Sequence, residues 1–247
     1  MVNRESLKKF AIESAAIISS ILIAFSIDSY WDLHKQEQSR KTVISALEKD
    51  FEKTYQELEN SITHKNNVVD TMAKIILLPE ASVMALNVKE SRKMINTLTT
   101  VYTYLPPTAS VESLVSSGEL NNISNQKLRE SLASYRFELE SLRRTQKWVL
   151  DTTNHRTIPF LAERIPMHLF SYNGPKIEGN VHNLDAKIPH DVTETFIVPL
   201  FSELEFRNLA QNRLLAVRLT ILKLKVLQES VAEVCKVLKN TRCGGNT

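Results

Sequence analysis

The chain has 247 residues, of which 43% are hydrophobic and 24% charged, as in an ordinary folded protein with one sizeable core or two small domains. The formal net charge is only +3, with both signs interspersed. Nucleic-acid binding calls for a basic patch or stripe, so no nucleic-acid partner is expected. The chain contains only 5 glycines, which argues against a fold built on tight β-turns and favours an all-α protein.

Residues 10–31 form the most apolar stretch, with the sequence FAIESAAIISSILIAFSIDSYW. A helix that crosses a bilayer needs about 20 mostly apolar residues. The sequence therefore predicts an N-terminal transmembrane helix, and the lipid bilayer as a partner. Basic residues at 4, 8 and 9 resist translocation and favour a cytoplasmic tail over residues 1–9. In a bacterium, this orientation describes a single-pass inner-membrane protein with most of its chain in the periplasm.

A cleaved signal peptide is the alternative interpretation of this stretch. Its basic start and apolar centre would look similar, and Ala24-Phe25-Ser26 offers small residues for cleavage. A retained anchor is favoured because Glu13 interrupts the apolar centre and a long helical pattern follows it.

Small residues recur at every fourth position of the predicted span, at Ala16, Ser20 and Ala24. A second such row lies beside the first, at residues 11, 15 and 19. Small residues let another helix approach closely in a membrane, so the first row is a candidate packing face for other transmembrane helices. The partner helices would belong to a hetero-complex or to a homo-oligomer. The alternative is that alanine and serine simply occur in this span.

Three further residues of the span are candidates for a role at the membrane. Glu13 is an intramembrane acid that either pairs with Lys9 at the membrane edge or binds a partner or an ion inside an oligomer. Tyr30 and Trp31 fit the aromatic belt at the far membrane interface.

The rest of the chain predicts helices with heptad rows of apolar residues. The first continues from the span without glycine or proline and ends at Pro79, with Lys65 alone interrupting its row. A shorter helix is expected over 89–102, and another before a left-handed cap at Gly118. A further long helix, the third helix below, begins at a cap on Ser124 or Asn125 and runs to about residue 157.

Residues 166–200 contain most of the remaining prolines and glycines and predict a long irregular loop. The last helix is expected to open with a capping box from Ser202 to Glu205. Polar residues Gln146 and Gln228 stand within the otherwise apolar rows of the third and last helices. Trp148 beside the row of the third helix is expected in the core or on the bundle surface.

The economical fold is an N-terminal transmembrane helix continuous with an elongated antiparallel four-helix bundle over residues 32–240, followed by a flexible tail over 241–247. Cys235 and Cys243 stand near the end of the chain. They form a disulfide if the tail folds back in an oxidising compartment. The preferred alternative is a buried Cys235 and a free Cys243.

Two pieces of the chain resemble an uncharacterised family of bacterial single-span membrane proteins with a helical domain of unknown function. One is the anchor, where Glu13 is followed by ILIAF at 21–25 and by Trp31. The other is SSGELNNISNQKLRESLASY at 116–135, which matches the pattern SG-x-L-x-x-I followed by LR-x-x-L-x-x-Y. The anchor departs from the family by lacking a glycine before the acid and asparagines before the tryptophan. The resemblance implies membrane placement and no activity.

Chemistry-bearing motifs are weak in this sequence. Residues His182, Asp185, His190 and Asp191 cluster in the predicted loop, but their spacing matches no metal site, and no cofactor is expected. No nucleophile elbow or phosphate loop is present. The leading hypothesis is a non-enzymatic interaction protein, a scaffold or accessory subunit of a membrane complex. The alternatives are an extracytoplasmic sensor or ligand-binding module and a homo-oligomeric pore lined by Glu13 and Ser20.

Overall fold

The computed structural model describes residues 4–116, 118, 120, 123, 125–167, 192–238 and 243, and within helices it leaves out the side chains of residues 4–12, 15, 16, 33, 36 and 193. Throughout these described ranges the protein is all-helical and contains no strand. The chain divides into two compact units, residues 1–50 and 51–247, and each is described by itself.

Helix α1 runs from Arg4 to Ile76 as one element, and the boundary between the two units falls inside it. Its last carbonyls are satisfied by the amides that follow, because Leu77 N–H donates to the Ala73 carbonyl at 3.0 Å. The helix therefore ends three residues before Pro79, as the sequence predicts, since proline disfavours helical geometry in the residue before it.

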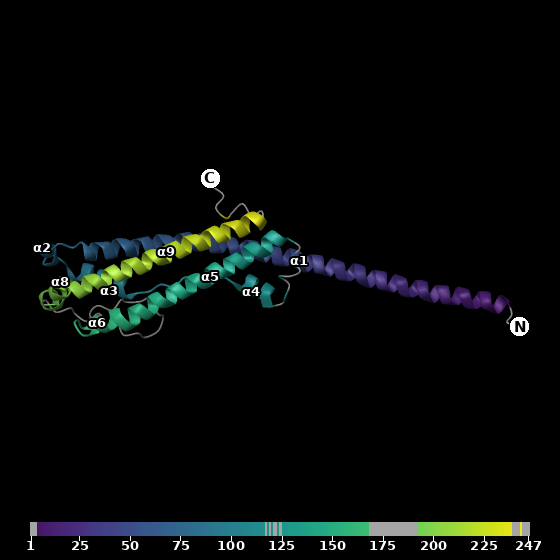
Figure 1. Cartoon of the computed structure of the whole chain (residues 1–247), viewed down its shortest axis with the longest axis horizontal. Helices are drawn as coiled ribbons and strands as arrows, with labels where there is room; N and C mark the ends of the chain where they lie inside the picture. Colours follow the sequence, from purple (N-terminus) through teal and green to yellow (C-terminus); the bar gives the residue numbers. More distant parts are fainter. Residues whose placement is uncertain are drawn as a thin grey trace. The chain divides into compact units, whose positions relative to one another are not determined.

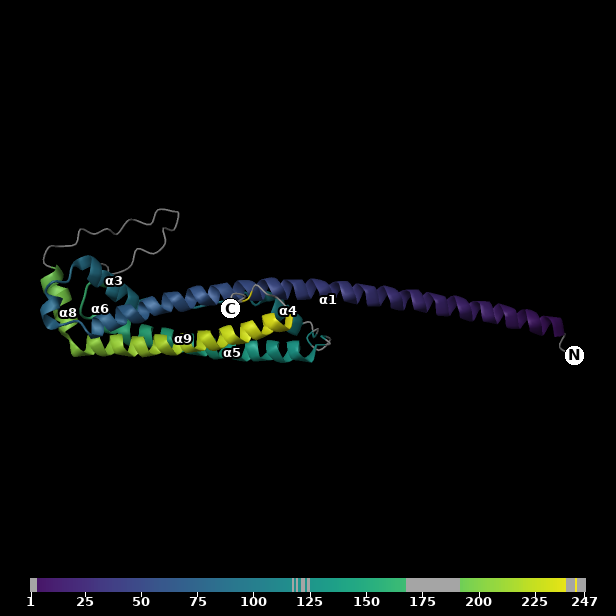
Figure 2. The same ribbon diagram turned by 90° about the horizontal axis from the view of Figure 1, so that it is seen from above.

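The second unit contains the rest of α1 and all later elements. They are α2 (Glu80–Val83), α3 (Val88–Thr99), α4 (Ala109–Ser116), α5 (Gln126–Thr152), η2 (Thr153–Thr157), α6 (Ile158–Ala162), η3 (Thr193–Ile197), α8 (Val198–Ser202) and α9 (Leu204–Leu238). Within this unit α9 packs along α5 and runs in the opposite direction (Figure 1). The part of α1 in this unit also lies beside α9, and the chain returns along the helices through α3, an extended stretch and α4 (Figure 2).

The apolar rows predicted from the sequence form the core of this unit. All seven row positions of α5 are buried, from Leu128 to Val149, and they include the polar Gln146. In α1, Phe51 is buried and its ring meets that of Tyr135 edge to face, with centroids 4.8 Å apart. Near the other end of the same unit, α1, α3, α8 and α9 share a cluster of buried residues, among them Met72, Ile95, Phe201 and Phe206.

The cap residues lie where the sequence predicts them. Asn125 precedes α5 and its side chain accepts from the Leu128 amide at 3.2 Å. Gly118 follows α4 with φ of +74°, the left-handed conformation in which a side chain would be strained. Of the two cap residues considered, Asn125 is therefore the one that begins the third long helix.

Prolines 159 and 199 are each accommodated by a wide π-helical turn. η2 precedes Pro159 and η3 precedes Pro199, and in each case the proline is the second residue of the short helix that follows. A proline inside an α-helix lacks its N–H and clashes with the carbonyl four residues earlier. In η2 the Ile158 amide reaches five residues back to Thr153, and this wider turn makes room for the ring.

Three predicted boundaries are wrong. The irregular loop expected over 166–200 is helical from residue 192 onward, whereas 168–191 lie outside the described residues. The helix expected over 89–102 ends at Thr99, and residues 100–108 are extended. Ser202 does not begin the last helix but ends α8, and the extended Glu203 separates α8 from α9. A serine and glutamate at capping spacing were a misleading signal here, because Pro199 had already started a short helix.

Candidate functional site

The extended segment 100–108 runs among the helices without a strand beside it. A buried peptide group needs a hydrogen-bond partner, and a lone extended segment cannot supply one from within itself. Side chains from three long helices supply these partners. They are Lys65 of α1, Gln146 of α5 and Arg213 of α9. The candidate site is built from these three polar residues and the segment they hold.

Lys65 is the residue that interrupts the apolar row of α1. Its side chain is buried, with only 5% of the residue exposed, and Nζ donates to the Tyr102 carbonyl oxygen at 2.5 Å. Burial, and then the nearby charge of Arg213, lower the pKa of Lys65 to about 8. The charged amine therefore lies in an environment that disfavours its charge.

Arg213 lies on α9, one residue before Leu214 of the predicted row, and is also only 5% exposed. Its Nη2 donates to the Thr100 carbonyl oxygen at 2.7 Å. Two other guanidinium nitrogens, Nε and Nη1, are buried and have no hydrogen-bond partner among the residues that the structure describes. Burial lowers the pKa of Arg213 to about 10, and the residue still carries its charge at neutral pH.

Gln146 completes the polar set on the side of α5. With its amide oriented to match its neighbours, it accepts from the Tyr104 N–H at 2.9 Å and donates to the Tyr104 carbonyl at 3.3 Å. The Tyr104 hydroxyl donates to the Thr54 carbonyl of α1 at 3.2 Å. Burial raises the pKa of Tyr104, so this hydroxyl remains protonated and able to donate.

We call Lys65 and Arg213, together with the carbonyls of Thr100 and Tyr102, the cationic layer. Each cation donates to a neutral carbonyl, and among the described residues neither forms an ion pair. The arrangement suits binding of negative charge better than acid–base chemistry, because both groups carry the same charge and no carboxylate contributes to either pKa shift.

The sequence signalled only part of this site. Lys65 and Gln146 were visible as polar residues in apolar rows, although nothing in the sequence indicates a partner for either. Arg213 was missed because it stands beside the row of α9 rather than in it, where arginines normally reach solvent. Gln228, the third such interruption, is half-buried and nothing in the structure explains it.

The residues singled out in the predicted span lie on α1 in the first unit. Glu13, Ser20 and Ala24 are exposed, whereas the side chain of Ala16 lies outside the described residues. Tyr30 and Trp31 are 71% and 68% exposed.

Across the described residues, no helix combines the length and the apolar character that membrane crossing requires. The predicted transmembrane helix is therefore not confirmed.

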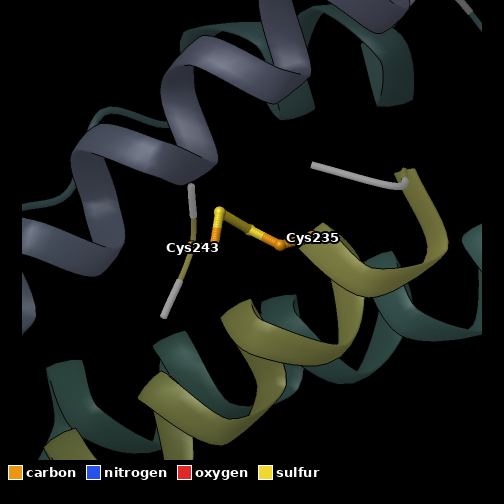
Figure 3. Close-up of a disulfide and its surroundings, with 2 residues drawn as sticks. All are labelled: Cys235 and Cys243. Atoms are coloured by element: carbon orange, nitrogen blue, oxygen red, sulfur yellow. A yellow bond between two sulfur atoms is a disulfide. The ribbon is translucent and has the colours of Figure 1, made fainter. Parts of the chain in front are cut away.

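Of the two interpretations of the cysteine pair, the structure contains the disulfide. Cys235 near the end of α9 is bonded to Cys243, and their Cα atoms are 6.0 Å apart (Figure 3). The Cys235 side chain is buried, and the bond holds Cys243 against the end of the helix. The alternative of a free Cys243 is thus wrong for this structure.

The histidines and aspartates considered as metal ligands, at 182, 185, 190 and 191, lie outside the described residues. Elsewhere in the described part of the chain, no group of three or more histidine, cysteine, aspartate or glutamate side chains is placed to hold a metal ion. Trp148 is 51% exposed and belongs to the surface of α5.

No family model, no curated protein and no solved structure matches this chain.

Proposed function

We propose that this chain is a membrane-anchored, non-enzymatic interaction protein that serves as a scaffold or accessory subunit of a membrane complex. In this proposal, residues 10–31 cross the bacterial inner membrane with residues 1–9 in the cytoplasm. Residues 32–240 form an elongated antiparallel four-helix bundle in the periplasm and present a surface to a partner.

One observation carries the proposal, namely the exposure of nine large apolar side chains in a stretch of fifteen residues on α1. Between 50% and 71% of each residue is accessible. At about 100° per residue these side chains are distributed around the whole helix axis. The widest gap between neighbouring apolar side chains around the axis is about 80°. The nine residues are Ile17, Ile18, Ile21, Leu22, Ile23, Phe25, Ile27, Tyr30 and Trp31.

A helix that is apolar on all sides requires an apolar environment on all sides. Covering each of these side chains is favourable by roughly 1 kcal/mol or more, since full burial of a large apolar side chain is worth about 1.5–3 kcal/mol. A single partner helix covers only one stripe, whereas the hydrocarbon of a bilayer covers the whole circumference. In sequence, the apolar run also extends back to Phe10. These features support membrane insertion.

The attachment is tested by washing membranes that contain the full-length protein with alkaline carbonate, which releases peripheral proteins. The wild type is expected to stay in the pellet. Replacing Leu22 and Ile23 by arginine is expected to release the protein, because each arginine at the centre of a span costs about 2.5–3.5 kcal/mol. Arginines at Leu77 and Met84, which are also exposed, are the matched control and are expected to change nothing. Release of the wild type would overturn the proposal.

The disulfide between Cys235 and Cys243 supports the periplasmic placement of the helical domain. Disulfides form and persist in oxidising compartments such as the periplasm and are rare in the cytosol. The basic residues before the apolar run favour the same orientation, with the N-terminus in the cytoplasm and the helical domain in the periplasm.

Helix α9 carries a second apolar row that faces solvent, and it supports the interaction role. Leu215, Leu219 and Leu222 are 53%, 41% and 56% exposed, and the half-buried Val226 continues the row. Steps of four, three and four residues are the spacing of a coiled-coil seam. We call these four residues the α9 seam. Exposed apolar rows of this kind mark surfaces for protein partners.

The charges beside the α9 seam indicate which kind of helix would pair with it. In heptad register Arg218, Lys223 and Lys225 take the positions that flank a coiled-coil seam, and all three are basic. Two copies paired in parallel through the seam would bring these like charges together. A helix of another protein, apolar along its own seam and acidic at the flanking positions, complements both the shape and the charge. Such a helix is the partner we propose.

A second candidate function, a ligand-binding module, is favoured by a cleft of about 450 Å³ beside the end of α1. This volume falls in the range of small-molecule sites. A saturable rise in the unfolding temperature of the full-length protein with an apolar ligand, lost in Met94→Trp, would support it. No rise across a broad panel would count against it. The cleft is lined by Ala73, Lys74, Leu77, Leu78, Pro79, Leu86, Glu90 and Met94.

A further inference from the structure

The cationic layer leaves charge uncompensated in the core of the helical domain. Lys65 and Arg213 come from different helices, and each is only 5% exposed. Each donates to a neutral backbone carbonyl. Across the described residues no carboxylate pairs with either. An isolated buried cation is costly, and buried charges are normally paired. Two adjacent cations with no counter-charge among the described residues therefore form an environment that favours an anion.

The donors of the layer also outnumber their acceptors. A guanidinium offers five N–H donors and an ammonium three. For Arg213, Nε and Nη1 are buried without a partner in the described part of the chain, and each has less than 1 Å² of accessible surface. Buried donors left without acceptors cost about 1–3 kcal/mol each, and more for charged groups. A water molecule would accept hydrogen bonds but supply no charge, whereas an anion supplies both.

We infer that the cationic layer is a binding site for a small monovalent anion of chloride size, held by the Arg213 guanidinium and the Lys65 ammonium. The free donor atoms have less than 1 Å² of accessible surface, so neighbouring side chains must shift to admit an anion, and a small halide requires the smallest shift. The anion would neutralise part of the charge that Lys65 and Arg213 place in the core. This inference goes beyond the proposed interaction function and does not depend on the membrane anchor.

The consequence for the protein is a stability that depends on halide concentration. A ligand that binds the folded state alone raises the free energy of unfolding as its concentration exceeds the dissociation constant. Because the layer joins α1 and α9 through the extended segment, losing the anion is expected to loosen that segment first.

The test follows thermal unfolding of the full-length protein in detergent by circular dichroism. Sodium chloride replaces sodium gluconate stepwise at constant ionic strength, so that general screening stays fixed. The wild type is expected to show a saturable rise in unfolding temperature, with bromide able to replace chloride. An equal unfolding temperature in chloride and gluconate would overturn the inference.

Variants separate this site from unspecific salt effects. Arg213→Gln and Lys65→Met are each expected to raise the chloride concentration at half-saturation by at least about tenfold, equivalent to about 1.4 kcal/mol. Lys65→Met serves if Arg213→Gln fails to fold, because methionine keeps the length of the side chain. Arg136→Gln and Lys147→Met, both on α5, remove exposed cations and are expected to respond like the wild type. An unchanged chloride response in both buried-site variants would contradict the assignment.

Discussion

Lys65 on α1 and Arg213 on α9 donate to carbonyl oxygens two residues apart on one extended segment, at 2.5 Å to Tyr102 and 2.7 Å to Thr100. The two cations thereby fasten the segment to two helices that are far apart in sequence. Such a polar connection inside an otherwise apolar core fixes one arrangement of the chain, because sliding the segment would leave two buried cations without their acceptors.

The first prediction concerns Gln146, which holds both the N–H and the carbonyl of Tyr104. Gln146→Leu keeps the volume but leaves two buried peptide groups without partners, and each costs about 1–3 kcal/mol. We expect the free energy of unfolding to fall by at least about 2 kcal/mol in urea titrations of the full-length protein. Gln228→Leu, at a half-buried row position of α9, is the matched control and should stay within about 0.5 kcal/mol of the wild type. Equal effects of the two substitutions would contradict the assigned role of Gln146.

The second prediction concerns the pH dependence of stability through Lys65. Its folded pKa, about 8, lies below the ordinary value of 10.5. Between these values the unfolded chain binds more protons than the folded protein, so stability rises with pH. The full difference corresponds to about 3 kcal/mol at 1.36 kcal/mol per pKa unit.

In gluconate buffer the free energy of unfolding should therefore rise from pH 8 to pH 10, and Lys65→Met should remove this rise. The window stops at pH 10 because the lowered pKa of Arg213, about 10, and the raised pKa of Tyr104 contribute above it. The lowered pKa of His64, caused by burial and by Lys65, acts below the window. A slope that persists in Lys65→Met would show that another group is responsible.

The third prediction concerns the disulfide between Cys235 and Cys243. Removing the cross-link with Cys243→Ser should lower the free energy of unfolding by about 2 kcal/mol, the value expected for closing a short loop. A reductant should bring the wild type to the same stability and leave the variant unchanged. In intact cells, thiol-alkylating reagents should not modify either cysteine unless the protein is first reduced. Free thiols in native membranes would argue against a periplasmic domain.

The fourth prediction concerns Gly118, which has φ of +74° after α4. A Cβ placed there meets no atom within 4 Å, so only backbone strain opposes a side chain. Gly118→Ala should therefore cost about 1 kcal/mol of stability, measured by urea unfolding. Gly118→Asn should cost less, because asparagine tolerates the left-handed region better. An alanine variant as stable as the wild type would mean that the turn relaxes to a different conformation.

The sequence predicted the row of α5 well because heptad spacing reports on burial. In the row predicted on α1, the alternate positions Tyr55, Ile62, Val69 and Ile76 are only half-buried. Every row position expected on α5 is buried, including Gln146. The cap at Asn125 and the turn at Gly118 were also predictable, because their local chemistry decides them.

The cationic layer could not be predicted, because its partners are separated by up to 113 residues in the sequence. Nothing near Lys65 in the sequence indicates that an extended segment will place the Tyr102 carbonyl against it. The end of α3 at Thr99 was missed for the same reason: the tertiary contacts of residues 100–104 override a local preference for helix.

The most direct test of the interaction role is native mass spectrometry of the full-length protein purified gently from its own membrane. We expect a complex of fixed stoichiometry with a second protein that contributes an acidic-flanked amphipathic helix. Leu219→Glu in the α9 seam should dissociate this complex, whereas Phe137→Glu, an equally drastic change at an exposed position of α5, should leave it intact. A strictly monomeric protein, a pure homo-oligomer, or the same complex in both variants would contradict the account.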